Sequence, residues 1–272
     1  MRTLASLQVR PRRNREFGHY MATAMFWEHH DDPFDLLIGE SAPMRHLKET
    51  IRRVATTGSH VVLRGEPGVG KELVARIVHQ RSGRVGPFNA INLGAIPKFK
   101  IAECLFGSEP PSHDCSESCA GRFEQAHLGT LFVVEIVETP KSLRAPFADV
   151  VRTKQLRRLR SQVTREADVR VVAAVSDPSD RLPNPIADAL SGVVIHIPPL
   201  RERGTDALLI ARAFLEQMHE GQRFSAEAER RLSMVDLPGN VRQLQNVVER
   251  AAVITDGAVI PASALLVHRG RR

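Results

Sequence analysis

A glycine-rich segment that begins at Gly65 has the residue types and spacing of a loop that binds phosphate groups. It follows the pattern GxxxxGK, in which glycines let backbone N–H groups surround the phosphates while the lysine reaches the outer ones. The residues concerned are Gly65, Glu66, Pro67, Gly68, Val69, Gly70, Lys71 and Glu72. Glu72 occupies the place of the usual hydroxyl residue, and it cannot serve Mg²⁺ in the same way. The alternative is a glycine-rich turn that binds nothing, but the elements expected on either side favour phosphate binding.

Those elements are a strand before the loop and a helix after it. An apolar run over 60–64 predicts the strand, and apolar residues at helical spacing predict the helix over 70–79. Further strands are predicted at 88–92, 130–136 and 169–175. These runs are rich in β-branched residues, as expected of strands that are buried on both faces. Because helical segments separate them, they predict an α/β fold with a parallel sheet flanked by helices.

Helical periodicity also marks both ends of the folded region. After Ser41, the apolar residues Met44, Leu47, Ile51 and Val54 follow one another at spacings of three and four, which predicts a helix. Beyond residue 200 the chain is expected to be entirely helical. Amphipathic helices are predicted there over 206–220, 226–235 and 240–255.

This pattern divides the chain into successive parts. A basic leader and a basic tail, both expected to be poorly ordered, enclose an α/β nucleotide-binding subdomain and a small helical lid subdomain. The predicted bounds are 1–33 for the leader, 34–203 for the α/β subdomain, 204–266 for the lid and 267–272 for the tail. No helix-turn-helix pattern follows Leu266, so no dedicated DNA-binding module is expected.

The composition agrees with packed helices on a parallel sheet, since 42% of the 272 residues are hydrophobic and there is one Trp and one Tyr. The net charge is +7, and basic residues cluster at the N-terminus, over 152–160 and at the tail. Such clusters are more typical of solvated faces and chain ends than of a DNA-binding groove. No apolar run approaches the ~20 residues of a membrane span. Residues 4–30 lack the apolar core of a secretory signal, so a cytoplasmic protein without a membrane partner is expected.

Three cysteines, Cys104, Cys115 and Cys119, fall within one short stretch. An odd number argues against a disulfide framework. A zinc site would need a fourth ligand, for which His113 is the nearby candidate, and the spacing lacks a CxxC pair. We therefore assign no metal ligands and expect reduced thiols.

Seven segments, in the same order along the chain, resemble the central AAA+ domain of sigma-54-dependent transcription activators. They are 37–41 (LIGES), 65–76 (GEPGVGKELVAR), 103–109 (ECLFGSE), 121–124 (GRFE), 129–132 (GTLF), 198–203 (PPLRER) and 237–244 (LPGNVRQL). The resemblance runs from about Phe34 to Leu266, and the LPGNVRQL segment is the most specific part of it. It implies a P-loop AAA+ fold.

Several residue roles are implied by this resemblance alone. AAA+ domains of this family form rings, hydrolyse ATP at subunit interfaces and remodel RNA polymerase that is bound by sigma-54. Residues 65–72 would hold the phosphates of ATP, and Glu72 matches the residue that usually follows the lysine in this family. Ile38 and Gly39 would lie near the adenine, and Arg242 would be the sensor arginine on the γ-phosphate side.

Other positions depart from the family and indicate a degenerate member. The second acidic motif of the family reads LFLDE, whereas residues 131–135 read LFVVE. Val134 thus replaces the aspartate that helps to hold Mg²⁺, while Glu135 keeps the place of the catalytic base. The sigma-contacting loop GAFTGA should follow residue 109, but residues 110–119 read PPSHDCSESC. Direct contact with sigma-54 RNA polymerase is therefore not expected.

The positions that complete the hydrolysis site also differ. The sensor strand of the family ends in Thr-Asn, and this chain has Val175 and Ser176, of which Ser176 can still form hydrogen bonds. The interface arginines of the family fall on Pro183 and Ala189, with Arg181 as the nearby substitute. Arginine fingers contribute ~10³–10⁵ in rate in related phosphoryl transfer, so their loss predicts slow hydrolysis.

These observations predict an ATP-binding AAA+ protein in transcription regulation that hydrolyses ATP slowly, with Mg²⁺ binding weakened at Val134. It would join an AAA+ homologue or assemble with copies of itself. One alternative is an active ATPase that activates sigma-54 RNA polymerase. The other is a non-enzymatic scaffold or a decaying remnant, in which the loop no longer binds nucleotide.

Overall fold

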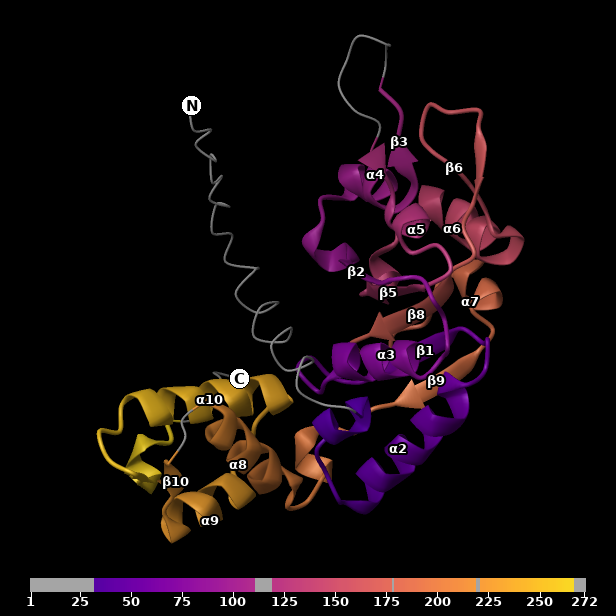
Figure 1. Cartoon of the computed structure of the whole chain (residues 1–272). Coiled ribbons are helices and arrows are strands. Elements are labelled where there is room, and N and C mark those ends of the chain that lie inside the picture. Colours follow the sequence, from indigo (N-terminus) through magenta and orange to yellow (C-terminus); the bar gives the residue numbers. More distant parts are fainter. Residues whose placement is uncertain (1–31, 111–118, 178, 219–220, 267–272) are drawn as a thin grey trace, which may run out of the picture. The chain divides into compact units, whose positions relative to one another are not determined.

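The structure, a computed structural model, describes residues 32–110, 119–177, 179–218 and 221–266 (Figure 1). The chain divides into two compact units, residues 1–36 and residues 37–272. The described part of the first unit is a 3-10 turn, η1 (Pro33–Leu36), where the Asp32 carboxylate accepts a hydrogen bond from the Phe34 N–H at 2.9 Å. The predicted basic leader, apart from residues 32 and 33, and the predicted basic tail lie outside the described residues.

A five-stranded parallel sheet forms the centre of the second unit, with strand order β2-β5-β8-β1-β9 (Figure 1). Its strands are β1 (Val61–Arg64), β2 (Phe88–Asn92), β5 (Thr130–Val134), β8 (Arg170–Val175) and β9 (Val193–His196). All six residues of β8 are buried, because helices cover both faces of the sheet. The predicted α/β fold with a parallel sheet is confirmed.

Two details of the sheet differ from the prediction. The edge strand β9 was not anticipated; it pairs with β1, with Ile195 opposite Leu63. The strand predicted to reach Ile136 ends at Val134. Glu135 adopts the left-handed conformation with φ 54°, which takes it out of the ladder, and the 3-10 turn η4 (Ile136–Glu138) follows.

One face of the sheet is covered by four helices that follow β2 in the chain. They are α4 (Ile101–Phe106), α5 (Arg122–Gln125), α6 (Lys141–Thr153) and α7 (Ile186–Ala189). Leu105, Phe123 and Phe147 from the first three belong to one apolar cluster with Val133 of β5 and Ala173 of β8. The rings of Phe123 and Phe147 meet edge to face, with centroids 5.0 Å apart.

The other face carries the two helices that flank the glycine-rich loop in sequence. Side chains alternate along a strand, so Val172 and Ala174 point away from the Phe123 side. There α3 (Lys71–Gln80) contacts β1 and β5, and α2 (Ala42–Ala55) contacts α3 and β9. The predicted apolar stripe of α2, including Met44 and Ile51, is buried. The glycine-rich loop therefore leaves a central strand and enters a helix that is held firmly on the sheet.

The lid begins at the 3-10 turn η5 (Leu200–Glu202), whose Leu200 belongs to the lid's own apolar core. Its helices are α8 (Asp206–Met218), α9 (Ala226–Met234) and α10 (Asn240–Val253). Ile210, Leu232 and Leu244 from these helices pack in one cluster. The prediction of a purely helical lid was wrong in one respect, because β10 (Arg223–Phe224) and β11 (Val259–Ile260) form a short parallel pair. The turn η6 (Ala262–Ala264) closes this part.

Two antiparallel pairs lie outside the main sheet. β3 (Gly107–Ser108) pairs with β4 (Cys119–Ala120), and β6 (Gln155–Arg157) pairs with β7 (Thr164–Glu166). Residues 111–118, where the sequence departs from GAFTGA, connect β3 to β4 and lie outside the described residues. The short turns η2 (Leu93–Ala95) and η3 (Lys98–Lys100) link β2 to α4.

The basic run over 152–160 is not merely a solvated face, as the sequence suggested. Arg158 is 8% exposed, and its guanidinium donates to the carboxylates of Glu124 and Glu109 at 2.7 to 3.0 Å. The hydrogen bonds to Glu124 are the largest cause that raises the pKa of Arg158. This partly buried ion cluster joins the β6–β7 hairpin to Glu124 of α5 and to Glu109, which directly follows β3.

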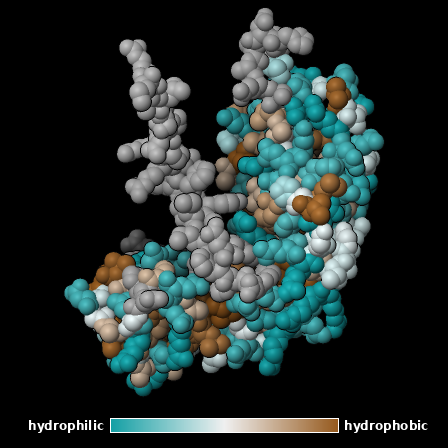
Figure 2. Space-filling view, viewed as in Figure 1, coloured by the Kyte–Doolittle hydropathy of each residue, from teal (hydrophilic) through white to brown (hydrophobic). Residues whose placement is uncertain are grey.

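The visible surface in Figure 2 is mostly hydrophilic, with hydrophobic residues in separate small groups. Val85, Phe99 and Met234 are the most exposed of the large apolar side chains. Single exposed apolar residues of this kind are ordinary on a folded domain. Within the described residues, no helix has both the length and the apolar character needed to cross a membrane.

Candidate phosphate-binding site

The glycine-rich loop joins β1 to α3, and two of its glycines have backbone conformations that other residues rarely adopt. Gly68 has φ 79° and Gly70 has φ 105°. A Cβ atom on Gly68 would lie 2.3 Å from the backbone oxygen of Gly239, so a side chain has no room there. Both glycines are thus required by the path of the chain, and this path brings the loop against the lid.

Lys71 is the first residue of α3, and its ammonium group lies at the carboxyl edge of the sheet. Its Nζ donates hydrogen bonds to the backbone oxygens of Gly65 and Glu66, at 2.6 and 3.1 Å, and to Ser176 Oγ at 2.9 Å. Burial lowers the pKa of Lys71, while the nearby Glu135 carboxylate acts in the opposite direction. An incoming phosphate would replace some of these contacts of the ammonium group.

Ser176 connects Lys71 to Glu135. The Ser176 hydroxyl accepts from Lys71 and donates to the Glu135 carboxylate. The three residues follow β1, β8 and β5, which are neighbours in the sheet, so their side chains meet where the strands end. The structure therefore brings together the phosphate loop, the sensor position and the catalytic-base position that the sequence suggested.

The oxygen ligands that Mg²⁺ prefers are not available at the expected positions. Val134 lies in β5 between Asn92 and Ala174 and offers no oxygen from its side chain. The Glu72 carboxylate accepts hydrogen bonds from Arg76 at 2.7 and 3.1 Å. No group of three or more His, Cys, Asp or Glu suited to a metal ion occurs among the described residues. Val134 therefore offers no side-chain ligand to Mg²⁺, and one oxygen of the Glu72 carboxylate is already bound to Arg76.

The lid side of the loop is fixed through three successive backbone oxygens. Those of Pro67, Gly68 and Val69 accept from Asn240 Nδ2 at 3.1 Å, from the Arg242 N–H at 3.3 Å and from Arg203 Nη2 at 2.9 Å, respectively. In a trans peptide the C=O and the following N–H point in opposite directions. The N–H groups of residues 68, 69 and 70 therefore point away from these lid donors, and within the described part of the chain they donate to no acceptor.

Glu66 places a carboxylate in the loop, and it is paired with the lid. Arg201 donates to both of its oxygens, at 2.7 and 2.9 Å, and Asn240 Nδ2 donates at 3.1 Å. The hydrogen bonds from Arg201 are the largest cause that lowers the pKa of Glu66. The negative charge of Glu66 is therefore compensated within the chain.

The predicted sensor residue, Arg242, lies in the first turn of α10 and is exposed. Its backbone N–H is bound to the Gly68 oxygen, and its positive charge contributes to the lowered pKa of Lys71. Arg242 is therefore close to the loop. Its role on a γ-phosphate stays a prediction.

Ile38 and Gly39, predicted to lie near an adenine, are held at the junction with the lid. Ile38 packs against the lid core. Gly39 has φ 147°, and a Cβ there would lie 2.7 Å from Asp206 Oδ2 at the start of α8. Asp206 also accepts hydrogen bonds from the N–H groups of Glu40 and Ser41, at 2.8 and 3.1 Å. The contact with adenine stays a prediction.

Sequence reasoning missed three residues that shape the loop. Arg201, Arg203 and Asn240 occur within the PPLRER and LPGNVRQL segments, which served only as signs of resemblance. Arg203 is 2% exposed, and burial lowers its pKa to about 10, while Asp206 acts in the opposite direction. The available signal was the pair of arginines in PPLRER, since charged residues soon after two prolines mark a fixed turn that can bind another segment.

Other predicted positions lie apart from this site or outside the described residues. Arg181 is exposed in the segment between β8 and α7, and its reach to a neighbouring subunit stays a prediction. Cys104 and Cys119 are free thiols, whereas Cys115 and His113 fall outside the described residues.

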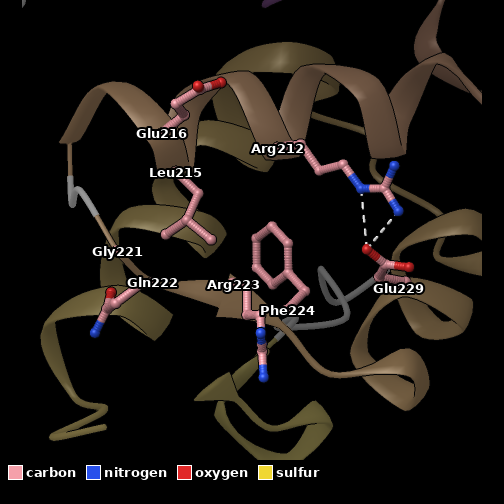
Figure 3. Close-up of a pocket in the computed structure, with 8 residues that line it drawn as sticks. All are labelled: Arg212, Leu215, Glu216, Gly221, Gln222, Arg223, Phe224 and Glu229. Carbon is pink, nitrogen blue, oxygen red and sulfur yellow. Dashed lines mark hydrogen bonds and ion pairs between the residues drawn. The ribbon is translucent and has the colours of Figure 1, made fainter. Parts of the chain in front are cut away.

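A cavity of about 560 Å³ lies within the lid and contains none of the loop residues (Figure 3). It is lined by Arg212, Leu215, Glu216, Gly221, Gln222, Arg223, Phe224 and Glu229. Arg212 and Glu229 form an ion pair at its edge, with the closest atoms 2.6 Å apart. Its position makes it part of the lid rather than of the phosphate site.

A parallel sheet of this strand order, with a glycine-rich loop after a central strand and a lid of helices, defines a P-loop protein of the AAA+ class. The family model described as Sigma-54 interaction domain matches residues 37–183. The model described as AAA+ ATPase lid domain matches residues 201–269. The chain belongs to the sigma-54 interaction domain family.

Curated relatives are regulatory proteins of bacteria. The chain is 35% identical over 248 residues to the Nif-specific regulatory protein of Rhodobacter capsulatus, covering 87% of this chain and 43% of the relative. It is 35% identical to the transcriptional activator RocR of Bacillus subtilis (85% and 53% covered). It is 37% identical to the C4-dicarboxylate transport transcriptional regulatory protein DctD of Rhizobium meliloti (84% and 53% covered). The chain thus spans about half the length of the curated relatives it matches.

Solved structures show the same architecture. NtrX from Brucella abortus in complex with ADP matches with a TM-score of 0.77 and 27% identity, covering 93% of this chain and 60% of NtrX. The same protein in complex with ATP matches with a TM-score of 0.77 and 28% identity. The RuvB Holliday junction branch migration motor of Thermotoga maritima, at 14% identity and a TM-score of 0.56, shares the fold.

Proposed function

We propose that this chain binds ATP at the glycine-rich loop and takes part in the regulation of transcription as a sigma-54-interaction-type AAA+ protein. The observation that carries the proposal is the set of N–H groups of residues 68–70, which are turned away from the lid and lack acceptors in the described part of the chain, next to the Lys71 ammonium group. Such an arrangement suits phosphate oxygens. The complexes of NtrX with ADP and with ATP support a nucleotide as the ligand.

In this proposal the chain hydrolyses ATP slowly. The Glu135 carboxylate, which would activate water, is bound by the Ser176 hydroxyl. Val134 supplies no carboxylate for a metal, so the phosphate charge is compensated by Lys71 and Arg242. Pro183 and Ala189 occupy the positions of the interface arginines, and neither can compensate charge in a transition state.

The proposed partner is an AAA+ homologue or a second copy of this chain, because nucleotide sites of this class lie between subunits. Residues 110–119 do not carry the sigma-contacting sequence, so direct contact with sigma-54 RNA polymerase is not part of the proposal. A cytoplasmic location completes the proposal.

An active ATPase is the second candidate, and one observation favours it. Glu135 lies beside Ser176 and Lys71, at the carboxyl edge where a water molecule would attack a bound nucleotide. Steady turnover of ATP that disappears in Glu135→Gln would establish this candidate in place of slow hydrolysis.

A titration with a fluorescent ATP analogue, with and without Mg²⁺, tests the proposal. We expect saturable binding that weakens by about 10- to 100-fold in Lys71→Ala, since hydrogen bonds to charged groups contribute roughly 1.5–3 kcal/mol. The control Lys141→Ala, at an exposed lysine at the start of α6, should bind as the wild type does. The effect of Mg²⁺ should be small. Equal weak signals in all three proteins would overturn the proposal and favour the scaffold or remnant.

A further inference from the structure

The carboxylate of Glu66 is an unusual group to find in a loop that receives phosphates, because like charges repel. The structure shows how this charge is held: Arg201 binds both carboxylate oxygens with two nitrogens of its guanidinium group. Paired contacts of this kind fix direction as well as distance. Arg201 lies in η5, before the lid helices, and therefore reaches the loop from a segment that is distant in sequence.

Asn240 provides a second anchor for the same stretch. It is fully buried, and its Nδ2 donates to Glu66 Oε2 at 3.1 Å and to the Pro67 oxygen at 3.1 Å. Its Oδ1 accepts from the Leu200 N–H at 2.7 Å, directly beside Arg201. Arg201 and Asn240 thus form one unit that holds Glu66 and Pro67 from the lid side.

The direction of these contacts determines what the loop offers to a ligand. With the Pro67 oxygen bound to Asn240, the N–H of Gly68 points the other way, and the same relation holds at the next two peptide groups. Loss of the Glu66 anchor would let the first of these peptide groups rotate. The orientation of the loop N–H groups therefore depends on Arg201 and Asn240, which lie outside the phosphate site.

We propose that Arg201 is a positioning residue for phosphate binding, which acts through Glu66 to hold the loop with its N–H groups presented to the nucleotide. This inference rests on the proposed function, since it assumes that the loop binds ATP. Arg201 contacts no nucleotide in this arrangement, because its two-pronged contact is directed at Glu66. The site is therefore built jointly by the sheet and by the lid.

The lid contains a matched control for this pair. Arg212 and Glu229 have side chains that are 54% and 29% exposed, against 52% and 28% for Arg201 and Glu66 (Figure 3). The closest distances are 2.6 and 2.7 Å. Arg201→Met and Arg212→Met therefore remove ion pairs of similar exposure and distance, of which only the first touches the loop.

The first measurement is hydrogen exchange, followed residue by residue by NMR in the protein without nucleotide. The Arg242 N–H bridges lid and loop, since it donates to the Gly68 oxygen, and the Leu200 N–H donates to Asn240, the residue that holds Glu66 and Pro67. We expect Arg201→Met to accelerate exchange at both by about three- to tenfold, the range typical of residues that couple neighbouring elements. Arg212→Met should leave both rates unchanged. Equal rates in the two variants would overturn the inference.

The second measurement is the affinity for ATP. Arg201→Met should weaken it by about three- to tenfold, and Arg201→Lys should recover part of the loss, because lysine keeps the charge but not the two-pronged contact. In a Glu66→Gln background, Arg201→Met should have little further effect. A full effect in that background would mean that Arg201 contacts the nucleotide itself, which would overturn the inference.

The two measurements separate this inference from the proposed function. If the wild type shows no ATP binding that depends on Lys71, the proposed function fails, and with it the phosphate role of Arg201, even where exchange at Leu200 and Arg242 responds to Arg201→Met. If ATP binds and Arg201→Met behaves as Arg212→Met does, only the positioning role fails.

Discussion

The two edges of the central sheet hold their charged side chains in opposite ways. At the amino edge, Arg170 is 1% exposed and donates to the backbone oxygens of Val54, Ala55 and Ser59, at 2.8, 2.8 and 2.9 Å. At the carboxyl edge, Lys71 is only half-buried and shares its hydrogen bonds with a loop whose N–H groups still lack acceptors among the described residues.

This difference separates a structural charge from a charge that can bind a ligand. The guanidinium of Arg170 is enclosed by the C-terminal end of α2, and burial lowers its pKa to about 10. Its donors are directed at three backbone oxygens, of which the Val54 oxygen also accepts from Thr57, so exchange of these contacts for a ligand would cost stability. The contacts of Lys71 are with a loop and a serine hydroxyl, and phosphate oxygens can replace them.

The largest effect is expected from removing the charge at the amino edge. Arg170→Met removes the charged donor from three backbone oxygens, of which the Val54 oxygen keeps Thr57, and we expect it to lower the free energy of unfolding by about 3–5 kcal/mol. Urea unfolding measures this loss. The control Arg152→Met removes an exposed pair with Asp149 and should cost less than about 0.5 kcal/mol. If both variants lose a similar amount of unfolding free energy, Arg170 has no special structural role and the difference between the two edges of the sheet is contradicted.

A smaller effect is expected from crowding the loop at the carboxyl edge. Gly68 and Gly83 have φ 79° and 70°, but a Cβ meets the Gly239 oxygen at 2.3 Å in the first case and nothing within 4 Å in the second. Gly83→Ala should cost about 1–2 kcal/mol from backbone strain alone. Gly68→Ala should cost about 1–2 kcal/mol more and should also abolish ATP binding. Calorimetry and ATP titration together test this pair; intact binding in Gly68→Ala would contradict the description of the loop.

The carboxyl edge can also be tested by adding a side chain that could coordinate Mg²⁺. Val134→Asp restores an oxygen donor at the end of β5, and we expect Mg²⁺ to strengthen ATP binding by about tenfold in this variant. Val134→Asn provides a similar shape without the charge and should show a weaker response. The measurement is the ratio of ATP affinities with and without Mg²⁺. No change in Val134→Asp would show that the missing carboxylate is not what limits metal binding.

The smallest effect concerns pH at the amino edge. Burial is the largest cause that lowers the pKa of His60 and of His79 below the ordinary 6.5. A histidine whose pKa is lower in the folded protein than in the unfolded chain stabilises the fold fully above the unfolded pKa. This contribution is lost as pH falls from the unfolded pKa through the folded one. Stability should therefore decline below pH 6.5, and His60→Gln should flatten the decline. An identical pH profile in this variant would assign the decline to other groups.

The sequence predicted the elements more completely than the contacts between them. Apolar runs marked β1, β5 and β8, because strands buried on both faces leave a continuous hydrophobic pattern. The strand β9 also has an apolar run (193–195), but it was missed because the run is short and is soon followed by two prolines, which interrupt strands. The end of β5 was misplaced because the left-handed conformation of Glu135 leaves no mark in an apolar run.

The candidate site was predictable in part for a similar reason. The residues of the loop are contiguous, so spacing alone revealed them. Arg201 and Asn240 reach Glu66 from 135 and 174 positions away in the chain, and no local pattern specifies such a contact. Ser176 was recognised as a group that can form hydrogen bonds, but its place between Lys71 and Glu135 required the order of the strands.

Because the lid holds Glu66 and Pro67, the state of the lid and the affinity of the loop for ATP are coupled, and this coupling free energy can be measured. If ATP favours the anchored state of the loop, then any molecule that favours the same state must strengthen ATP binding by the same factor, because linkage between two sites is reciprocal. A neighbouring subunit that presses on α10 would then act as an effector of affinity without contact with the nucleotide. Conversely, nucleotide would tune how readily the protein accepts such a neighbour. If hydrolysis is slow, as proposed, bound ATP would then report on assembly without being consumed.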